Sequence, residues 1–171
     1  MAARTALILA LALAGASPVA AMELSSPDIK QGTAVGLPQV YSKCGGGNAS
    51  PALSWRGAPA GTKSFAITAF DPDAHGGWWH WIVYNIPANV TSMGGGAPPG
   101  AFEQGRNDFG NNEYDGPCPP PGSGTHHYEF TVWALGTPTL PTEGATEGKI
   151  VGPYLQTHAL AHATLTATYE R

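Results

Sequence analysis

The stretch "TKSFAITAFDPDAHGGWWHWIVYNIP" (Thr62 to Pro87) contains two apolar runs joined by a short connection that ends in two glycines. Residues 62–71 and 80–87 have the length and the β-branched and aromatic composition that are typical of strands. The glycines of the connection suit a tight turn. The stretch therefore predicts two neighbouring strands, with Asp71 at the end of one and His80 at the start of the next, so that these two polar residues lie close together.

The rest of the chain also consists of short apolar or alternating runs separated by glycines and prolines. Its 23 glycines and 16 prolines fall in clusters that separate short apolar or alternating runs. Residues 152–163 suit a short helix, with Pro153 in its first turn, and residues 91–124 form a long connection without periodicity. Further strands are expected at residues 51–55, 126–135 and 164–170. We therefore expect a mainly β fold with one or two short helices near the C-terminus.

The N-terminus has the pattern of a secretory signal peptide. Arg4 is followed by an apolar run of about a dozen residues and by small residues around a cut after Ala21. The run is too short for a membrane anchor, which needs about 20 consecutive apolar residues, and no later segment is long enough either. We expect residues 1–21 to be removed and residues 22–171 to form one periplasmic or secreted domain, without stable membrane insertion.

The charge of the chain excludes some partners. The sequence has eight basic and 12 acidic side chains. Removal of Arg4 with the signal peptide leaves seven basic side chains and a formal charge of −5. So acidic a domain has no general attraction for nucleic acid or for anionic membranes. Any anion that it binds must be held by a local site.

The chain has two cysteines, Cys44 and Cys118. In an exported protein a disulfide is the first interpretation, because disulfides persist in oxidising compartments. The alternative is two free thiols, one of which could be a nucleophile.

The segment "HHYEF" separates two adjacent histidines. Side chains alternate across a strand, so His126 and Tyr128 share one face and His127 lies on the other. We expect His126 to belong to a site and His127 to the surface. An aspartate such as Asp71 beside a histidine would orient the ring and favour its protonated form, which donates hydrogen bonds to anions.

Three kinds of site compete for these residues. A metal site would use His75, His80, His126, Asp71 and Asp73, but no His-Glu-x-x-His motif or paired cysteine spacing supports it. A hydrolase would need a nucleophile or an activated water. No serine lies in a Gly-x-Ser-x-Gly motif, although an Asp/His pair could act as a general base. We therefore favour a binding pocket, which needs only convergent polar groups on an apolar floor.

Tryptophans Trp78, Trp79 and Trp81 could supply that floor. Large aromatic residues are more often part of the core or its rim, so we expect at least one of the three to be a core residue. In the segment "YDGPCPPPG", Gly116 could offer a backbone N–H donor, and the prolines could form a stiff wall because they have no N–H group.

The sequence resembles the phosphatidylethanolamine-binding protein family, in particular its bacterial Raf-kinase-inhibitor-like branch. The matching segments occur in the family's order and cover most of residues 22–171. They are "NASPALSW" (Asn48 to Trp55), "TKSFAITAFDPDA" (Thr62 to Ala74), "GWWHWIVYNIP" (Gly77 to Pro87), "GRNDFG" (Gly105 to Gly110) and "YDGPCPPPGSGTHHYEFTVWAL" (Tyr114 to Leu135).

The resemblance implies a β-sandwich of antiparallel sheets, with a small pocket for phosphate-like anions or a phosphorylethanolamine head group. The family's pocket residues fall on Asp71, His80, Gly116, Pro117, His126 and Tyr128. The resemblance also implies a disulfide between Cys44 and Cys118, as in some exported relatives.

The chain departs from the family's pattern in three places. The turn after "DPD" is the short "AHGG", His127 replaces the usual arginine, and an extra proline lengthens "CPPPGSG". The first and third changes border the pocket and affect the size of ligand that it can take.

Together, the residues and the resemblance predict an exported, non-enzymatic protein that binds a small anionic phosphoryl-type ligand and needs no cofactor or metal. His80, His126, Tyr128 and the Gly116 backbone would donate to the anion, with Asp71 orienting one histidine. The expected wall residues are Trp79, Trp81, Asp73 and Pro117. Binding should weaken as the pH rises past about 6.5, the pKa of free imidazole. The alternatives are a module that inhibits a kinase or protease partner and, less favoured, an Asp/His-assisted hydrolase.

Overall fold

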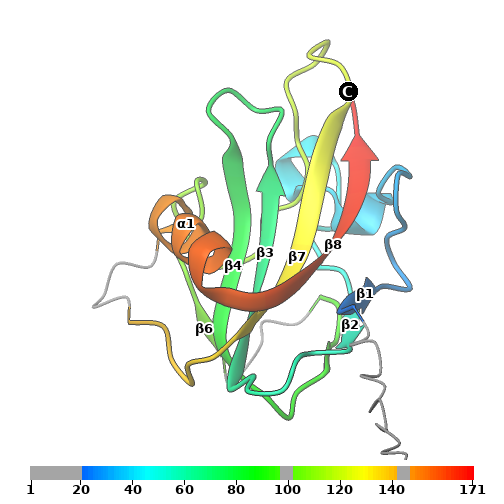
Figure 1. The fold of residues 1–171 in the computed structure, drawn as a ribbon. Helices are drawn as coiled ribbons and strands as arrows, with labels where there is room; N and C mark the ends of the chain where they lie inside the picture. The colour runs from blue at the N-terminus through cyan, green and yellow to red at the C-terminus, as the bar shows by residue number, and fades with distance from the viewer. Residues whose placement is uncertain (1–20, 97–101, 142–146) are drawn as a thin grey trace, which may run out of the picture.

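The computed structural model describes residues 21–96, 102–141 and 147–171 (Figure 1). Residues 1–20, nearly all of the expected signal peptide, lie outside the described residues. The strands are β1 (Glu23–Ser25), β2 (Leu53–Arg56), β3 (Ser64–Asp71), β4 (Trp78–Pro87), β5 (Ser92–Met93), β6 (Glu103–Gln104), β7 (His126–Leu135) and β8 (Ala159–Tyr169). The helices are α1 (Gly148–His158) and two short 3-10 turns, Leu37–Gln39 and Ser42–Cys44.

The strands form two antiparallel sheets. The larger has the order β6-β4-β3-β7-β8 and the smaller has the order β1-β2-β5. This arrangement confirms the expected mainly β fold of two antiparallel sheets with a helix near the C-terminus. The strands expected at residues 62–71, 80–87 and 126–135 correspond to β3, β4 and β7.

The main core lies between the two sheets. Leu53 and Trp55 of β2 pack there against buried residues such as Phe65 and Ile67 of β3. A second core lies on the other face of the larger sheet, where Leu155 and its neighbours in α1 cover residues of β4 and β7. The larger sheet is therefore buried on both faces near its centre, which explains why β3 and β4 are nearly continuous apolar runs.

A β-bulge in β4 determines which of its side chains face each core. Ala69 of β3 pairs with Trp81, whereas Phe70 pairs with Trp79, so His80 is an extra residue in β4. As a result Trp81 lies in the main core, and Trp79 lies on the side of α1. His80 lies on the same side as Trp81, with its ring against that of the core residue Tyr128. The strict alternation that the sequence suggests is broken at this position.

The C-terminal prediction is partly wrong. We expected a helix over residues 152–163 and a strand only from Thr164. In the structure α1 begins at Gly148 and ends at His158, so Pro153 lies inside the helix and not in its first turn, and β8 begins at Ala159. Residues 159–163 instead pair with β7, in contacts that include Trp133 with His162. The backbone hydrogen bonds along this ladder outweigh the helical preference of the alanines, which is a weak guide to structure.

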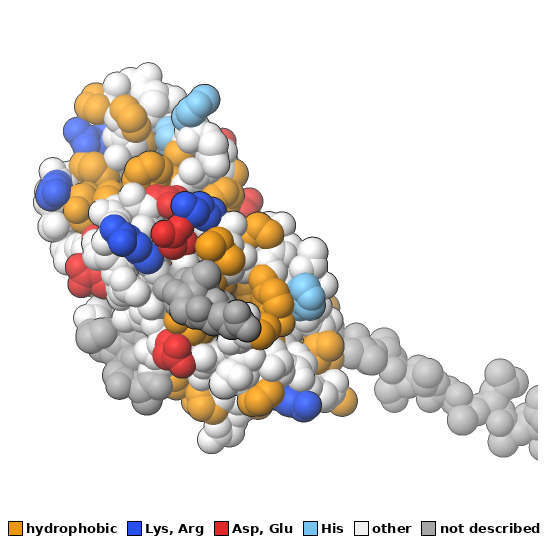
Figure 2. Space-filling view, turned by 90° about the vertical axis from the view of Figure 1, so that its left-hand side faces the viewer, with side chains coloured by type: hydrophobic (Ala, Val, Ile, Leu, Met, Phe, Trp, Pro, Cys, Tyr) orange, Lys and Arg blue, Asp and Glu red, His pale blue; other side chains and the backbone are white. Residues whose placement is uncertain are grey.

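The side of the molecule that carries α1 shows a mixed surface. In Figure 2 its Lys and Arg side chains lie beside Asp and Glu side chains and do not form a patch of one sign. Lys149 and Glu147 form one such ion pair, 2.7 Å apart. No helix in the three described ranges is long and apolar enough to cross a membrane.

Candidate ligand-binding site

A cavity of about 410 Å³ lies where β3 ends and where β4 and β7 begin. Because the strands are antiparallel, Asp71 at the end of β3 pairs with Trp78 at the start of β4. The cavity is lined by Asp71, Asp73, Ala74, His75, Trp78, His80, Phe109, Cys118, Pro119, Pro120, Ser123, His126 and Tyr128. The structure therefore brings together Asp71, His80, His126 and Tyr128, four of the six predicted ligand-binding residues.

Asp71 and His126 form a buried pair. The Nδ1–H of His126 donates to Asp71 Oδ2 at 2.7 Å. The other carboxylate oxygen of Asp71 accepts the backbone N–H groups of Asp73 and Ala74. Asp71 is thus fixed on both oxygens and orients the ring of His126, which leaves Nε2 of that ring on the cavity side, 3.1 Å from Ser123 Oγ.

The sequence left open which histidine Asp71 orients, and the structure gives His80 a different partner. Its Nδ1–H donates to the backbone carbonyl of Asp115 at 2.6 Å, so Asp71 orients His126 and not His80. Burial lowers the pKa of His80 below the ordinary histidine value, and the Asp115 carbonyl and nearby carboxylates oppose this only in part. His80 is therefore neutral at pH 7, with Nε2 left to meet a ligand.

The carboxylate of Asp115 holds the loop that positions His80. It accepts hydrogen bonds from the side-chain amides of Asn48, Asn107 and Asn111 at 2.6–3.2 Å. Asp115 is buried, so these three charge-assisted bonds offset the cost of removing its charge from water. No signal in the sequence pointed to this role, although Asn48, Asn107 and Asp115 lie in three of the matching segments.

Tyr128 presents an unpaired donor. Its side chain is 1% exposed, and its hydroxyl has no hydrogen-bond partner within the described part of the chain. Burial and then the nearby Asp71 carboxylate raise the pKa of Tyr128 above the ordinary tyrosine value. The hydroxyl therefore keeps its proton and is a buried donor next to the cavity that Tyr128 helps to line.

Asp73 lies at the edge of the cavity and is paired with His127. Its Oδ2 accepts both the backbone N–H and the ring Nδ1–H of His127, at 2.7 and 2.8 Å. The hydrogen bond from the His127 ring is the main reason why the pKa of Asp73 is lowered. His127 is exposed, which confirms the face predicted for it.

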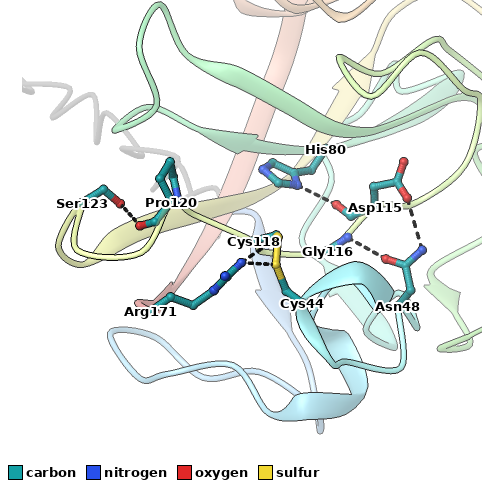
Figure 3. Close-up of a disulfide and its surroundings, with 9 residues drawn as sticks. All are labelled: Cys44, Asn48, His80, Asp115, Gly116, Cys118, Pro120, Ser123 and Arg171. Carbon is teal, nitrogen blue, oxygen red and sulfur yellow. Dashed lines mark hydrogen bonds between the residues drawn. A yellow bond between two sulfur atoms is a disulfide. The ribbon is translucent and has the colours of Figure 1, made fainter.

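Gly116 and Pro117 do not line the cavity. The N–H of Gly116 donates to Asn48 Oδ1 at 2.9 Å, so its predicted use as an anion donor is wrong (Figure 3). A Cβ at Gly116 would come 1.9 Å from the carbonyl oxygen of Gln39, which explains the glycine. Pro117 accepts the backbone N–H of Tyr41. The wall is formed by the next residues, Pro119 and Pro120.

The predicted wall residues Trp79 and Trp81 also lie elsewhere. Trp79 packs against α1, and Trp81 is a core residue whose indole N–H donates to Gln104. Trp78 takes the place at the cavity, where its ring meets that of Phe109 edge to face at 5.6 Å. The sequence contained no signal for the bulge at His80, which is the cause of this change.

The disulfide between Cys44 and Cys118 is present and forms part of the wall (Figure 3). The Cα atoms of the two cysteines are 5.8 Å apart, and the side chain of Arg171 donates toward both sulfurs. The first interpretation of the two cysteines is therefore confirmed. The bond ties the proline-rich wall to the 3-10 turn that contains Cys44.

The cavity combines an apolar wall with the side chain of Tyr128 and with the Nε2 atoms of His80 and His126, which can donate to an anion only when their rings are protonated. His75 lies on its rim. In the described ranges, no three His, Cys, Asp or Glu side chains are grouped so as to hold a metal ion.

Comparisons with known proteins agree on one family. A family model described as phosphatidylethanolamine-binding protein matches residues 25–170. The UPF0098 protein YbcL of Escherichia coli is 47% identical over 163 residues, which are 88% of each chain. Its crystal structure superposes with a TM-score of 0.83 over 89% of this chain and 99% of that one, at 45% identity.

Two further relatives are similar over most of the chain. The UPF0098 protein YbhB of Escherichia coli is 41% identical over 158 residues, covering 86% of this chain and 99% of its own. A Mycobacterium tuberculosis protein that is named as a lipoprotein, LppC, is 36% identical over 150 residues, covering 87% of this chain and 72% of its own.

Proposed function

The chain belongs to the phosphatidylethanolamine-binding protein family, and we propose on that basis that its cavity binds small anions that carry a phosphoryl-type group. The observation that carries the proposal is the hydroxyl of Tyr128. A buried donor without an acceptor costs about 1–3 kcal/mol of stability, and an acceptor that a ligand brings would remove this cost.

The two histidines support the same proposal. The Nε2 atoms of His80 and His126 are the ring nitrogens left after Asp115 and Asp71 have bound the Nδ1–H groups. A protonated Nε2 would donate directly to an anion oxygen. An anion within hydrogen-bond distance would in turn favour the protonated ring. The free protein holds His80 neutral at pH 7, so binding should be tighter at pH 5.5 than at pH 8.

Two tyrosines provide a matched test. Tyr128→Phe removes the unpaired hydroxyl, so we expect binding of phosphate or O-phosphorylethanolamine to weaken by about tenfold or more, with stability unchanged or slightly higher. The control is Tyr114→Phe, since the Tyr114 hydroxyl is buried but donates to the Gln39 carbonyl. That variant should lose about 1 kcal/mol of stability and keep its affinity.

Isothermal titration at pH 5.5 and 8 measures the affinities, and urea denaturation measures the stabilities. Phosphate itself titrates in this pH range, whereas sulfate stays a dianion, so sulfate isolates the contribution of the protein. His126→Ala should bind both anions weakly at either pH. Equal affinity of the wild type and of Tyr128→Phe, or equal sulfate binding at the two pH values, would overturn the proposal.

We also propose that the protein acts outside the cytoplasm. The disulfide fits an exported protein, as does similarity to a relative that is named as a lipoprotein. Cell fractionation of the natural host with an antibody against the purified protein would test this. Recovery with the cytoplasmic fraction would contradict it.

A further inference from the structure

Ser123 adds a group to the cavity that the anion-binding proposal does not use. It lies in the loop between Pro120 and β7, is exposed, and borders the cavity (Figure 3). On either side of it Gly122 and Gly124 have φ angles of +78° and +90°, a conformation that favours glycine. The chain reverses direction around these two glycines, and the serine hydroxyl lies beside His126 at the start of β7.

The side chains of Ser123, His126 and Asp71 form a hydrogen-bonded chain there. Ser123 Oγ is 3.1 Å from His126 Nε2, and His126 Nδ1 is 2.7 Å from Asp71 Oδ2. Both distances fall in the hydrogen-bond range that links a nucleophile to its base and that base to the group orienting it. All three residues line the cavity; His126 and Asp71 are buried in its wall, and Ser123 is exposed.

From this geometry we propose that Ser123, His126 and Asp71 form a nucleophile, base and orienting carboxylate that hydrolyse small carboxylic esters. This activity goes beyond the proposed binding of anions and does not depend on it. The assignment follows from distances and not from a sequence motif, because Ser123 lies in no Gly-x-Ser-x-Gly segment.

The hydroxyl proton has two acceptors within reach. Ser123 Oγ donates to the Pro120 carbonyl at 2.8 Å, and His126 Nε2 lies 3.1 Å away. Rotation about the Cβ–Oγ bond moves the proton from one to the other. With Nδ1–H held by Asp71, a neutral His126 has its lone pair on Nε2, where it can accept this proton.

The reaction balances without a cofactor. Oγ attacks the ester carbonyl carbon while its proton passes to His126 Nε2. The bond to the alkoxide leaving group then breaks, and the alcohol leaves with that proton. Water next gives a proton to His126 Nε2 and attacks the acyl-serine. The bond from the acyl carbon to Oγ then breaks, and His126 returns its proton to Oγ, which releases the carboxylic acid and restores the serine. Asp71 stabilises the imidazolium in both halves of the reaction.

The cavity also offers a donor and a surface for the substrate. Tyr128 lines the same cavity and is the nearest candidate among the described residues for a hydroxyl donor to the oxyanion of the tetrahedral intermediate, a type of contribution that is often worth 100-fold or more in rate. Trp78, Phe109 and Pro119 supply apolar walls for a short acyl chain. An ester with a small acyl group therefore fits the site better than a long-chain lipid ester.

A fluorophosphonate reagent and p-nitrophenyl acetate test the proposal on the purified protein. We expect the reagent to modify a single serine, which peptide mass spectrometry should locate at Ser123, and to block release of p-nitrophenol. Ser123→Ala should abolish both reactions. Thr125→Val is the matched control, because the Thr125 hydroxyl lies in the same loop but donates to Glu170, and it should leave both reactions unchanged.

The Asp71→Asn variant tests whether Asp71 and His126 activate Ser123 or only lie near it. The Asn side chain can keep the acceptor for the backbone N–H groups of Asp73 and Ala74 but turns an amide N–H toward His126, which forces the proton of the ring onto Nε2. We expect modification and ester turnover to fall by about 100-fold or more. A thermal melt of each variant confirms that it is folded.

The result that would overturn the proposal is a folded wild type that the reagent does not modify, or modification that Ser123→Ala retains. Sulfate titrations on the same preparations keep the two proposals apart. Ser123→Ala should still bind sulfate through His80 and Tyr128. Loss of ester turnover with intact sulfate binding would therefore show that the variant lacks only the nucleophile. Turnover without sulfate binding would contradict only the proposed anion site.

Discussion

His126 and His127 are adjacent in the sequence but occupy different environments. His126 is buried against Asp71, and His127 is exposed beside Asp73. Their separation was predictable, because side chains alternate along any regular strand. The partner of His126 was not predictable, because Asp71 lies 55 residues earlier in the sequence. His80 is closer to Asp71 in the sequence, but its ring bonds to the carbonyl of Asp115. Alternation predicts a face, but only the packed sheet determines the partner.

The lowered pKa of His80 predicts a loss of stability in acid. The unfolded chain takes up a proton on His80 near pH 6.5, whereas the folded chain does so only at a lower pH. The contribution of His80 is therefore complete above about pH 6.5 and is lost as the pH falls toward the folded pKa, with a slope of at most about 1.4 kcal/mol per pH unit.

Urea denaturation at several pH values between 5 and 7.5 measures this slope. His80→Gln should show a smaller slope than the wild type over the same range, because the other titratable groups remain in both proteins. Identical slopes would show that the folded protein does not hold His80 neutral.

At the scale of single elements, the bulge in β4 explains most of the errors in the predicted wall. Alternation from Trp79 would place Trp79 and Trp81 on one face of β4. The extra residue His80 separates them and turns Trp78 to the cavity. Bulges depend on how two strands match each other along their length, so the sequence of one strand does not reveal them.

The same bulge lets α1 dock on Trp79. Gly148 and Gly152 lie against the indole ring, and a Cβ on either would come 2.2 Å from a ring atom. In an isolated helix, Gly152→Ala should stabilise by about 1 kcal/mol. Here we expect a net loss of about 1–2 kcal/mol in the free energy of unfolding, because overpacking costs more than the helix gains.

A double-mutant cycle with Trp79→Ala checks the cause. In that background Gly152→Ala should stabilise the protein, because the ring that it would strike is gone, and urea denaturation of the four proteins gives the coupling energy. Ile150→Ala, at an exposed position of the same helix, should change stability little. A Gly152→Ala effect that is the same in both backgrounds would contradict this account of the docking.

At the scale of the whole molecule, the disulfide connects segments that the sheets leave separate. Cys44 ends the second 3-10 turn, Cys118 lies in the long connection before β7, and their sequence separation is 74. The glycine and proline clusters of the chain and its strand composition were enough to predict a mainly β fold. The position of that long connection over the end of the sheet was not predictable, because it has no periodicity and is fixed by buried polar contacts such as those of Asp115.

Closing so long a loop stabilises the folded protein by about 4 kcal/mol on the chain-entropy model. The Cys44→Ser/Cys118→Ser double variant should therefore lose up to about 4 kcal/mol of unfolding free energy, measured in urea. The wild type with reducing agent should match the double variant. A variant as stable as the oxidised wild type would show that the loop is held by its other contacts alone.

Trp78 gives the cavity a spectroscopic property. It is 36% exposed, whereas Trp55, Trp81 and Trp133 are buried and Trp79 is covered by α1. Aqueous quenchers such as iodide reach this indole ring far more easily than the other four. A molecule that enters the cavity shields it, so the intrinsic fluorescence of the unlabelled protein reports occupancy of the site at concentrations too low for calorimetry.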